Sequence, residues 1–237
     1  MTRFRPRLLP TLFTVPVVLL CLGLGVWQVQ RLFWKENLIA AREAALAAPP
    51  TAPPASLDAA RGMEFRRVAD DGVFLNDKEI FVGATSEAGR NGYHVFTPLR
   101  EASGRVVFVN RGFIPAELKD RARRPAGEPA GTVRVEGLLR LPPADKPGWF
   151  LPDNRADLNY WFWPDLAAMS AADALGEVAP FYIDADAAPN PGGWPKGGVT
   201  RTRLPNDHLQ YAITWFSFAV AASVIYVLSE RRHPGPA

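Results

Sequence analysis

Two long apolar stretches without charged residues, one near each end of the chain, most strongly limit what this sequence can fold into. Residues 8–30 and residues 209–229 contain no Asp, Glu, Lys or Arg. Each stretch can cross a bilayer as a helix, because about 20 apolar residues span the hydrocarbon core. The sequence therefore predicts two transmembrane helices, 8–30 and 209–229, that flank one domain outside the membrane, residues 34–205.

The first stretch has a second interpretation as a cleaved signal peptide, because arginines precede it within residues 3–7. A signal peptidase requires small side chains just before the bond that it cleaves. The stretch instead ends in bulky and amide side chains, among them Trp27 and Gln28, and Arg31 follows. We therefore expect an uncleaved helix.

Basic residues next to the two stretches predict the orientation. Arginines lie within residues 3–7 and at residues 231–232, and basic flanks favour the cytoplasmic side. Arg31 and Lys35 argue for the opposite orientation, but long domains translocate largely regardless of charge. Only five of the 27 basic residues are lysines, a usage typical of GC-rich bacterial genomes. We expect a bacterial inner-membrane protein with both termini in the cytoplasm and residues 34–205 in the periplasm.

The pattern between the two stretches is typical of a β-rich domain. Residues 35–48 read as a helix leading out of the membrane, and the proline-rich residues 49–54 as a linker. Short β-branched and aromatic segments follow, separated by turn residues: 65–74, 79–83, 92–96, 106–109, 133–136 and 181–183. A helical pattern covers 165–175, and the polar residues 122–131 are expected to form an exposed loop. The predicted class is α+β: one antiparallel domain, barrel-like or sandwich-like, with minor helix.

Composition excludes several classes of function. A net charge of +3 does not support a broad nucleic-acid surface. Cys21 is the only cysteine, so the chain has no internal disulfide and no zinc motif. His94 is the only histidine of the expected domain, and no GxSxG, P-loop or GxGxxG sequence occurs. We therefore expect no enzyme, and we interpret His94 as a strand residue that faces solvent or a partner.

Polar and aromatic residues gather where the two stretches meet the outer surface of the membrane. His208 immediately precedes the second stretch and shares a helical face with Tyr211 and Trp215. Trp27, Gln28 and Arg31 lie at the outer end of the first stretch. The two helices are expected to run antiparallel, which brings both groups to one depth. An imidazole, a guanidinium and flat aromatic rings could hold a planar anionic ligand such as haem. The alternative is an interfacial aromatic belt that only anchors the helices.

Several segments of the chain resemble the Surfeit-locus, or Shy-type, family of cytochrome c oxidase assembly factors. The matching segments lie in the family's order between the two apolar stretches and cover nearly the whole chain. They are LGVWQ at 24–28 with Arg31 and Lys35, FRRV at 65–68, TPL at 97–99, VNRGFIP at 109–115, EGLLR at 136–140, and NDHLQYAITWF at 206–216.

This resemblance implies an assembly factor for haem–copper oxidase that helps to deliver haem a to the catalytic subunit. His208 matches the histidine that the family resemblance implies as iron ligand, and Arg31 could pair with a propionate. Asp207 stands where the family usually has Asn. The implied partners are cytochrome c oxidase subunit I, haem a synthase and membrane lipid. Two alternatives stay open: a scaffold that stabilises subunit I without haem, and an enzyme acting on haem or lipid, against which the missing nucleophile–base set counts.

Two further motifs of the domain have structural interpretations. Residues 109–112 predict a strand that ends in a sharp turn, with a glycine at positive φ. Asn110 and Arg111 either tie that turn together or contact a partner. The aromatic cluster 161–163 is expected in the core or at the membrane surface.

Overall fold

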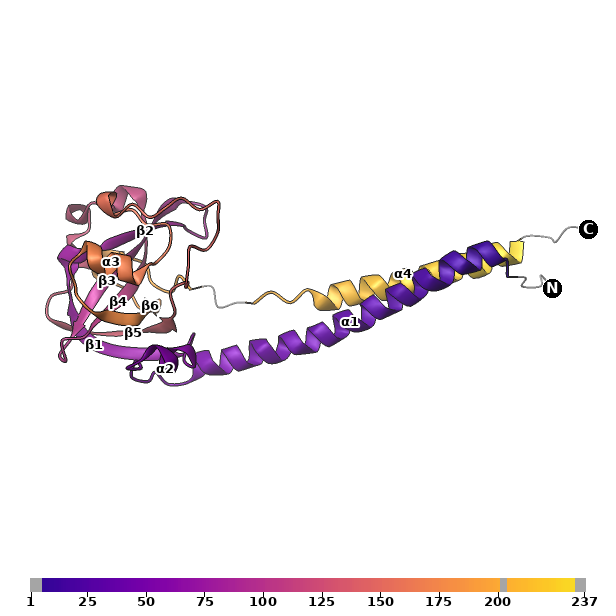
Figure 1. Cartoon of the computed structure of the whole chain (residues 1–237), viewed down its shortest axis with the longest axis horizontal. Coiled ribbons are helices and arrows are strands. Elements are labelled where there is room, and N and C mark those ends of the chain that lie inside the picture. The colour runs from indigo at the N-terminus through magenta and orange to yellow at the C-terminus, as the bar shows by residue number, and fades with distance from the viewer. Residues whose placement is uncertain (1–5, 201–203, 233–237) are drawn as a thin grey trace, which may run out of the picture. The chain divides into compact units, whose positions relative to one another are not determined.

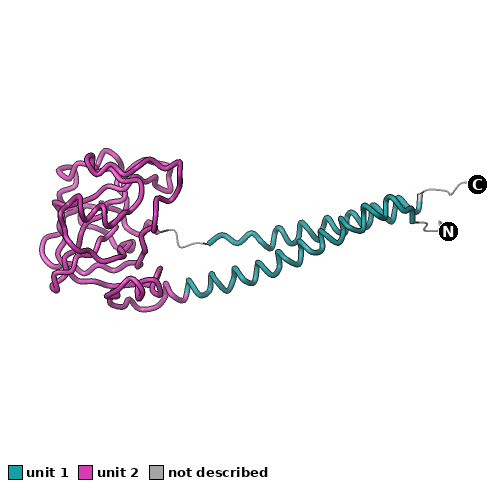
Figure 2. Tube along the Cα trace, viewed as in Figure 1, with its two compact units in different colours: residues 1–43, 203–237 teal, residues 44–202 magenta. Residues whose placement is uncertain are grey.

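The computed structural model describes residues 6–200 and 204–232. The chain divides into two compact units (Figure 2): one comprises Met1–Glu43 and Arg203–Ala237, and the other Ala44–Thr202. The first unit is helical and the second is built around a sheet (Figure 1). Each unit is described by itself.

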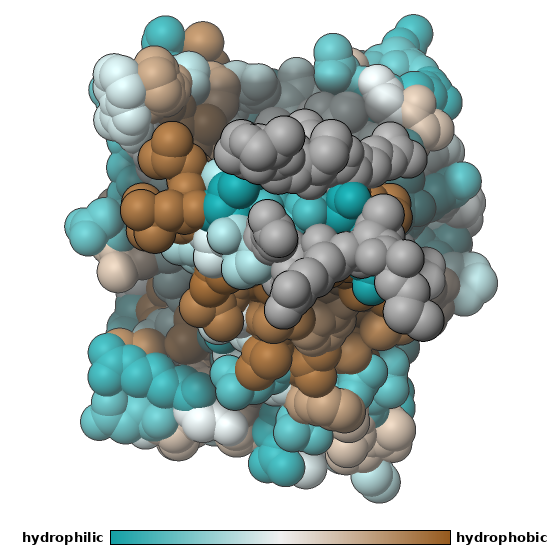
Figure 3. Space-filling model, turned by 90° about the vertical axis from the view of Figure 1, so that its right-hand side faces the viewer, coloured by the Kyte–Doolittle hydropathy of each residue, from teal (hydrophilic) through white to brown (hydrophobic). Residues whose placement is uncertain are grey.

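The helical unit consists of α1 (Leu8–Ala47) and α4 (His208–Arg232). Both helices are long and apolar enough to cross a membrane by length and composition. With 40 residues, α1 is about 60 Å long at 1.5 Å per residue, roughly twice the thickness of the hydrocarbon core. It therefore continues well past its charge-free stretch, and it includes most of the run 35–48 that was predicted to be helical. Apolar side chains gather near the middle of the face drawn in Figure 3.

Small residues let α1 and α4 pack closely and antiparallel. Cys21 and Gly25 of α1 and Ala212 and Ala219 of α4 are buried. A Cβ atom at Gly25 would lie 2.6 Å from the ring of Phe216. Helices in lipid associate through such close contacts, because no hydrophobic effect drives them together there.

A closed five-stranded barrel forms the second unit. Its strands are β1 (Arg67–Phe74), β3 (Asn91–Glu101), β4 (Val106–Pro115), β5 (Thr132–Arg140) and β6 (Val178–Ala185). They are hydrogen-bonded in the order β1-β5-β6-β4-β3, and β1 pairs with β3 to close the ring. The sixth strand, β2 (Ile80–Thr85), pairs with β3 outside this ring, and its free edge bonds to Trp161. Two short helices, α2 (Leu57–Arg61) and α3 (Leu166–Ala172), complete the domain.

The predicted β-rich domain with minor helix is confirmed, but the expectation of a purely antiparallel sheet is wrong for one pair. The strand β6 lies between β4 and β5; it runs antiparallel to β5 and parallel to β4. A period-two pattern reports which face of a strand is buried and carries no information about the direction of its neighbour.

The core has two main parts on either side of β4, whose ten residues are all buried. Inside the barrel, Leu99, Val107 and Phe181 belong to one cluster. On the other side, Phe108 packs with Trp161, which is 1% exposed. The expected core position of the 161–163 aromatics is therefore confirmed for Trp161.

The turn predicted at residues 109–112 is wrong, because β4 continues to Pro115. Gly112 does adopt a positive φ of 115°. That conformation accommodates the Lys196 carbonyl beside it, and Phe113 and Lys196 exchange backbone hydrogen bonds of 2.8 and 2.9 Å. The glycine thus lets another segment pair with the strand and does not end it.

The loop predicted at residues 122–131 is exposed at most of its positions, as expected, but Arg124 within it is buried. Two short 3-10 turns occupy this segment, Arg121–Arg123 and Pro125–Gly127. Arg124, between them, is only 4% exposed. A polar composition predicted solvent, whereas the guanidinium of Arg124 is buried against a carboxylate from a distant part of the chain.

Candidate functional site

The imidazole of His208 is hydrogen-bonded to the side chain of Gln28. His208 is the first residue of α4, and its Nδ1 lies 2.7 Å from Oε1 of Gln28 on α1. Because a carboxamide oxygen only accepts hydrogen bonds, this contact requires the tautomer in which Nδ1 carries the proton and donates it. In that tautomer Nε2 keeps its lone pair, which is the electron pair that binds a metal ion.

Arg31 lies about one turn beyond Gln28 on α1, and its guanidinium stacks on an aromatic ring. Its Cζ is 3.8 Å from the centroid of the Trp34 ring. Such a cation–π contact orients the guanidinium while its N–H groups remain able to bind an anion. Trp34 is absent from the predicted site; its i,i+3 spacing from Arg31 is the signal that could have found it.

The other predicted site residues present aromatic surface. Trp27 is 51% and Tyr211 56% exposed. Trp215 is half-buried and contacts Phe218 edge-on, with ring centroids 6.0 Å apart. The structure thus joins Gln28 to His208 directly and leaves large parts of the Trp27 and Tyr211 rings accessible.

His208 would be a single protein ligand to a metal. Among residues 6–200 and 204–232, no three His, Cys, Asp or Glu side chains lie close enough together to hold a metal ion. A bare ion needs several protein ligands, whereas a haem iron already has its porphyrin nitrogens and needs only axial ones. The site therefore suits an iron that is already bound by a porphyrin and does not suit a bare metal ion.

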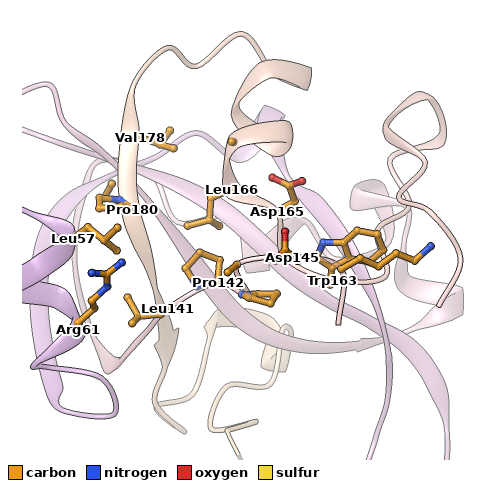
Figure 4. Close-up of a pocket in the computed structure, with 15 residues that line it drawn as sticks. Leu57, Arg61, Leu141, Pro142, Asp145, Trp163, Asp165, Leu166, Val178 and Pro180 are labelled. Atoms are coloured by element: carbon orange, nitrogen blue, oxygen red, sulfur yellow. The ribbon is translucent and has the colours of Figure 1, made fainter. Parts of the chain in front are cut away.

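In the barrel domain, a cavity of about 740 Å³ opens between α2, α3 and the segment that follows β5. Figure 4 shows Leu57 and Arg61 on one side of it, and Trp163 and Asp165 on another. Most of its lining is apolar, and the described charged residues around it are exposed or half-buried. Its four charged lining residues are Arg61, Asp145, Lys146 and Asp165, of which Lys146 pairs with Asp153 at 2.7 Å.

Two buried ionic clusters explain the polar residues of the 109–112 motif. In the first, Arg111 donates to the Gly127 carbonyl at 2.6 Å, and its Nη1 lies 3.7 Å from Oε1 of Glu79. Glu79 itself is bound through both oxygens by Arg124. Burial lowers the pKa of Arg111 to about 10, although the charge of Glu79 opposes that change.

The second cluster surrounds Asp184. Its carboxylate accepts from Asn110 Nδ2 at 2.8 Å, Arg140 Nη1 at 3.1 Å and Thr200 Oγ1 at 2.6 Å. Burial lowers the pKa of the nearby His94, an effect that Asp184 partly opposes. His94 lies on β3, as the prediction of a strand residue requires, and it is half-buried. Because Asn110 is only 3% and Arg111 2% exposed, the structural interpretation of their motif is favoured over surface contact with a partner.

Comparison with known proteins identifies the family. The family model described as "SURF1 family" matches residues 15–220, which include Gln28, His208 and the whole barrel. The chain belongs to the SURF1 family. The family resemblance expected from the sequence motifs is therefore confirmed.

Several relatives of known name share this similarity over most of their length. A SURF1-like protein of Monosiga brevicollis is 38% identical over 93% of this chain and 87% of its own. Surfeit locus protein 1 of Mus musculus is 36% identical over 86% of this chain and 70% of its own. The Homo sapiens protein of the same name is 34% identical, over 91% and 75%. The similarity therefore covers the helices and the barrel together.

Proposed function

We propose that this protein is a membrane-anchored assembly factor for haem–copper cytochrome c oxidase, which helps to deliver haem a to the catalytic subunit. Membership of the SURF1 family supports this role, since the family motifs around residues 24–28, 109–115 and 206–216 imply it. The proposed partners are subunit I of the oxidase, haem a synthase as the source of haem, and membrane lipid. No covalent chemistry is assigned to the protein.

The observation that carries the proposal is the hydrogen bond from His208 Nδ1 to Gln28 Oε1. A hydrogen bond of this kind orients a ligating imidazole, selects its tautomer and raises its basicity. His208 Nε2 would bind the iron of haem a, and Arg31 would pair with a propionate. Trp27, Tyr211 and Trp215 would contact the porphyrin.

A single histidine ligand suits a protein that must release its cargo. The second axial position of the iron would be empty, filled by water, or filled by a partner. Arg31 is exposed, so its ion pair with a propionate would be partly solvated and worth about 0–1 kcal/mol. These weak contacts leave the bond to His208 as the main specific one.

For location, we propose the bacterial inner membrane, with both termini cytoplasmic and the barrel in the periplasm. The two candidate spans and the arginines at residues 3–7 and 231–232 support this topology. Reporter fusions at Pro129 and at Ala237 should report opposite compartments. Equal signals from both fusions would contradict the hairpin topology and the common depth of Gln28 and His208.

The second candidate function is a scaffold that stabilises oxidase subunit I without binding haem. One observation favours it. Trp149 and Phe150 are 83% and 80% exposed and stack on each other with centroids 3.5 Å apart. Exposed aromatic pairs are typical of surfaces that contact partner proteins. Haem occupancy separates the two functions.

His208→Ala should lower the haem content of the purified protein and change the spectrum of any haem that remains, because it removes an axial bond. Gln28→Leu should weaken haem binding about 10–100-fold, the usual effect of losing a group that orients a metal ligand. Both should be measured by absorption spectroscopy after expression with a haem a biosynthesis system. Membrane level should hold, since Ala and Leu suit a membrane helix.

Gln30→Leu is the matched control for Gln28→Leu, because Gln30 is exposed and lies two residues along the same helix. It should bind haem as the wild type does. If the His208→Ala protein keeps wild-type haem occupancy and an unchanged spectrum, the haem site is wrong. A colourless protein that still restores oxidase assembly would establish the scaffold function.

A further inference from the structure

One buried cluster of the barrel domain, formed by Glu79, Arg111 and Arg124, contains more positive than negative charge. The side chains of Glu79, Arg111 and Arg124 are each 4% exposed or less. Glu79 binds Arg124 through both oxygens, whereas its 3.7 Å approach to Arg111 is too long for a hydrogen bond. One carboxylate thus faces two guanidinium groups. The nearby Glu128 does not correct this imbalance, because it is paired with Arg121 at 2.7 Å.

Arg111 also has unused hydrogen-bond donors. Its Nη2 donates to the Gly127 carbonyl at 2.6 Å and to Asn190 Oδ1 at 3.2 Å. Its Nε and Nη1 have no hydrogen-bond partner within the described part of the chain, although both are buried. Burying a charged donor without an acceptor is costly. The arrangement therefore favours a further negatively charged acceptor next to Arg111.

A cavity with room for such an acceptor adjoins Arg111. It has a volume of about 560 Å³, and Arg111 and Asn190 belong to its lining. Much of the remaining wall is apolar and includes Phe74, Val109 and Val133.

The other charged residues that line this cavity already have partners. Glu136 pairs with Arg67 and Arg134, and Asp186 accepts from the backbone N–H of Ala188 at 2.9 Å. The second lining cation, Arg134, has a side chain that is 56% exposed and pairs with Asp71 and Glu136. Arg111 is therefore the buried lining cation with unpartnered donors, and the apolar walls favour a ligand with hydrophobic surface.

We propose that this cavity binds the carboxylate of a small apolar organic acid. The carboxylate accepts a hydrogen bond from Arg111 and balances the second guanidinium of the cluster, while the apolar group packs against the wall formed by Val109 and Val133. A free acid and the C-terminal residue of a peptide share this chemistry. All residues that line the cavity belong to the barrel domain, and none belongs to the helical unit that contains His208 and Gln28.

Calorimetric titration of the purified full-length protein with 3-methylbutanoate and with 3-methylbutanamide tests the proposal. The acid should bind roughly ten- to hundredfold more tightly than the amide, the range expected for one buried hydrogen bond to a charged group. Arg111→Gln should remove this preference. Ala188→Trp should abolish acid binding by filling the cavity at an exposed position that leaves Arg111 in place. Arg155→Gln, at a 55% exposed side chain outside this cavity, should retain it.

Equal binding of acid and amide, or no binding of either, would overturn the proposal. Acid binding that persists in a folded Ala188→Trp protein would do so as well, and this variant keeps the test decisive if Arg111→Gln does not fold. A Gly-Gly-Val peptide with a free C-terminus distinguishes the two sources of carboxylate. Tighter binding of the peptide than of the free acid would identify a chain terminus as the ligand, and weaker binding would identify a free acid.

Discussion

Gly112→Ala should unfold the barrel domain or leave it close to unfolding. An added Cβ would lie inside van der Waals contact with the Lys196 carbonyl oxygen, and the residue has a φ of 115°. Backbone strain of about 1–3 kcal/mol adds to overpacking of about 1–3 kcal/mol. The sum is a large part of a typical stability of about 5–15 kcal/mol. Thermal unfolding followed by circular dichroism should show the lowered midpoint.

Gly104→Ala is the matched control for this prediction. Gly104 has a similar φ of 88°, but nothing lies within 4 Å of its added Cβ. It should therefore lose only the strain part, about 1–3 kcal/mol. Equal losses at the two glycines would mean that the contact with Lys196 contributes nothing and that backbone conformation alone matters at Gly112.

Glu79→Gln should destabilise the barrel domain by about 3–5 kcal/mol, because it leaves Arg111 and Arg124 buried without their shared counter-charge. The side chains of Glu79 and Arg124 are 1% and 2% exposed. Water therefore cannot solvate the guanidinium groups that would remain without their carboxylate. Urea unfolding of the full-length protein, followed by the fluorescence of buried tryptophan, measures this loss.

The comparison variant for Glu79→Gln is Glu117→Gln, which breaks the ion pair with Arg90. Those two side chains are 56% and 58% exposed, and an exposed pair contributes about 0–1 kcal/mol. A loss at Glu79 no larger than the loss at Glu117 would show that the buried cluster does not stabilise the domain. A second substitution, Arg124→Leu, should recover part of the stability of Glu79→Gln by removing one unpaired charge.

Local patterns in the sequence predicted most elements of this fold, because apolar periodicity and turn residues act over short distances. The strand at 133–136 and the helix at 165–175 appear as β5 and α3, with shifted ends. The parallel pairing of β4 with β6 could not be predicted, since it depends on which strands meet in space. The burial of Arg124 could not be predicted for the same reason. Its partner Glu79 lies 45 residues away along the chain, so no local pattern indicates the ion pair, and the polar segment was expected to be exposed.

The candidate site shows the same division between local and distant information. Their place at the outer end of the first apolar stretch grouped Trp27, Gln28 and Arg31 on α1, and helical spacing grouped His208 with Tyr211 on α4. The contact of Gln28 with His208 joins residues 180 positions apart, so only the packing of the two helices reveals it. The contact of Arg31 with Trp34 is local and could have been predicted from their spacing.

The two helices are held by polar contacts near both ends of their shared interface. At one end Gln28 binds His208, and at the other Arg7 binds Glu230 at 3.0 Å. Sliding one helix past the other by a single turn, about 5.4 Å, would break both contacts at once and would force the ring of Phe216 off Gly25. Contacts at both ends thus fix how far one helix can slide along the other, so the height of the imidazole along α1 is set within the helix pair itself.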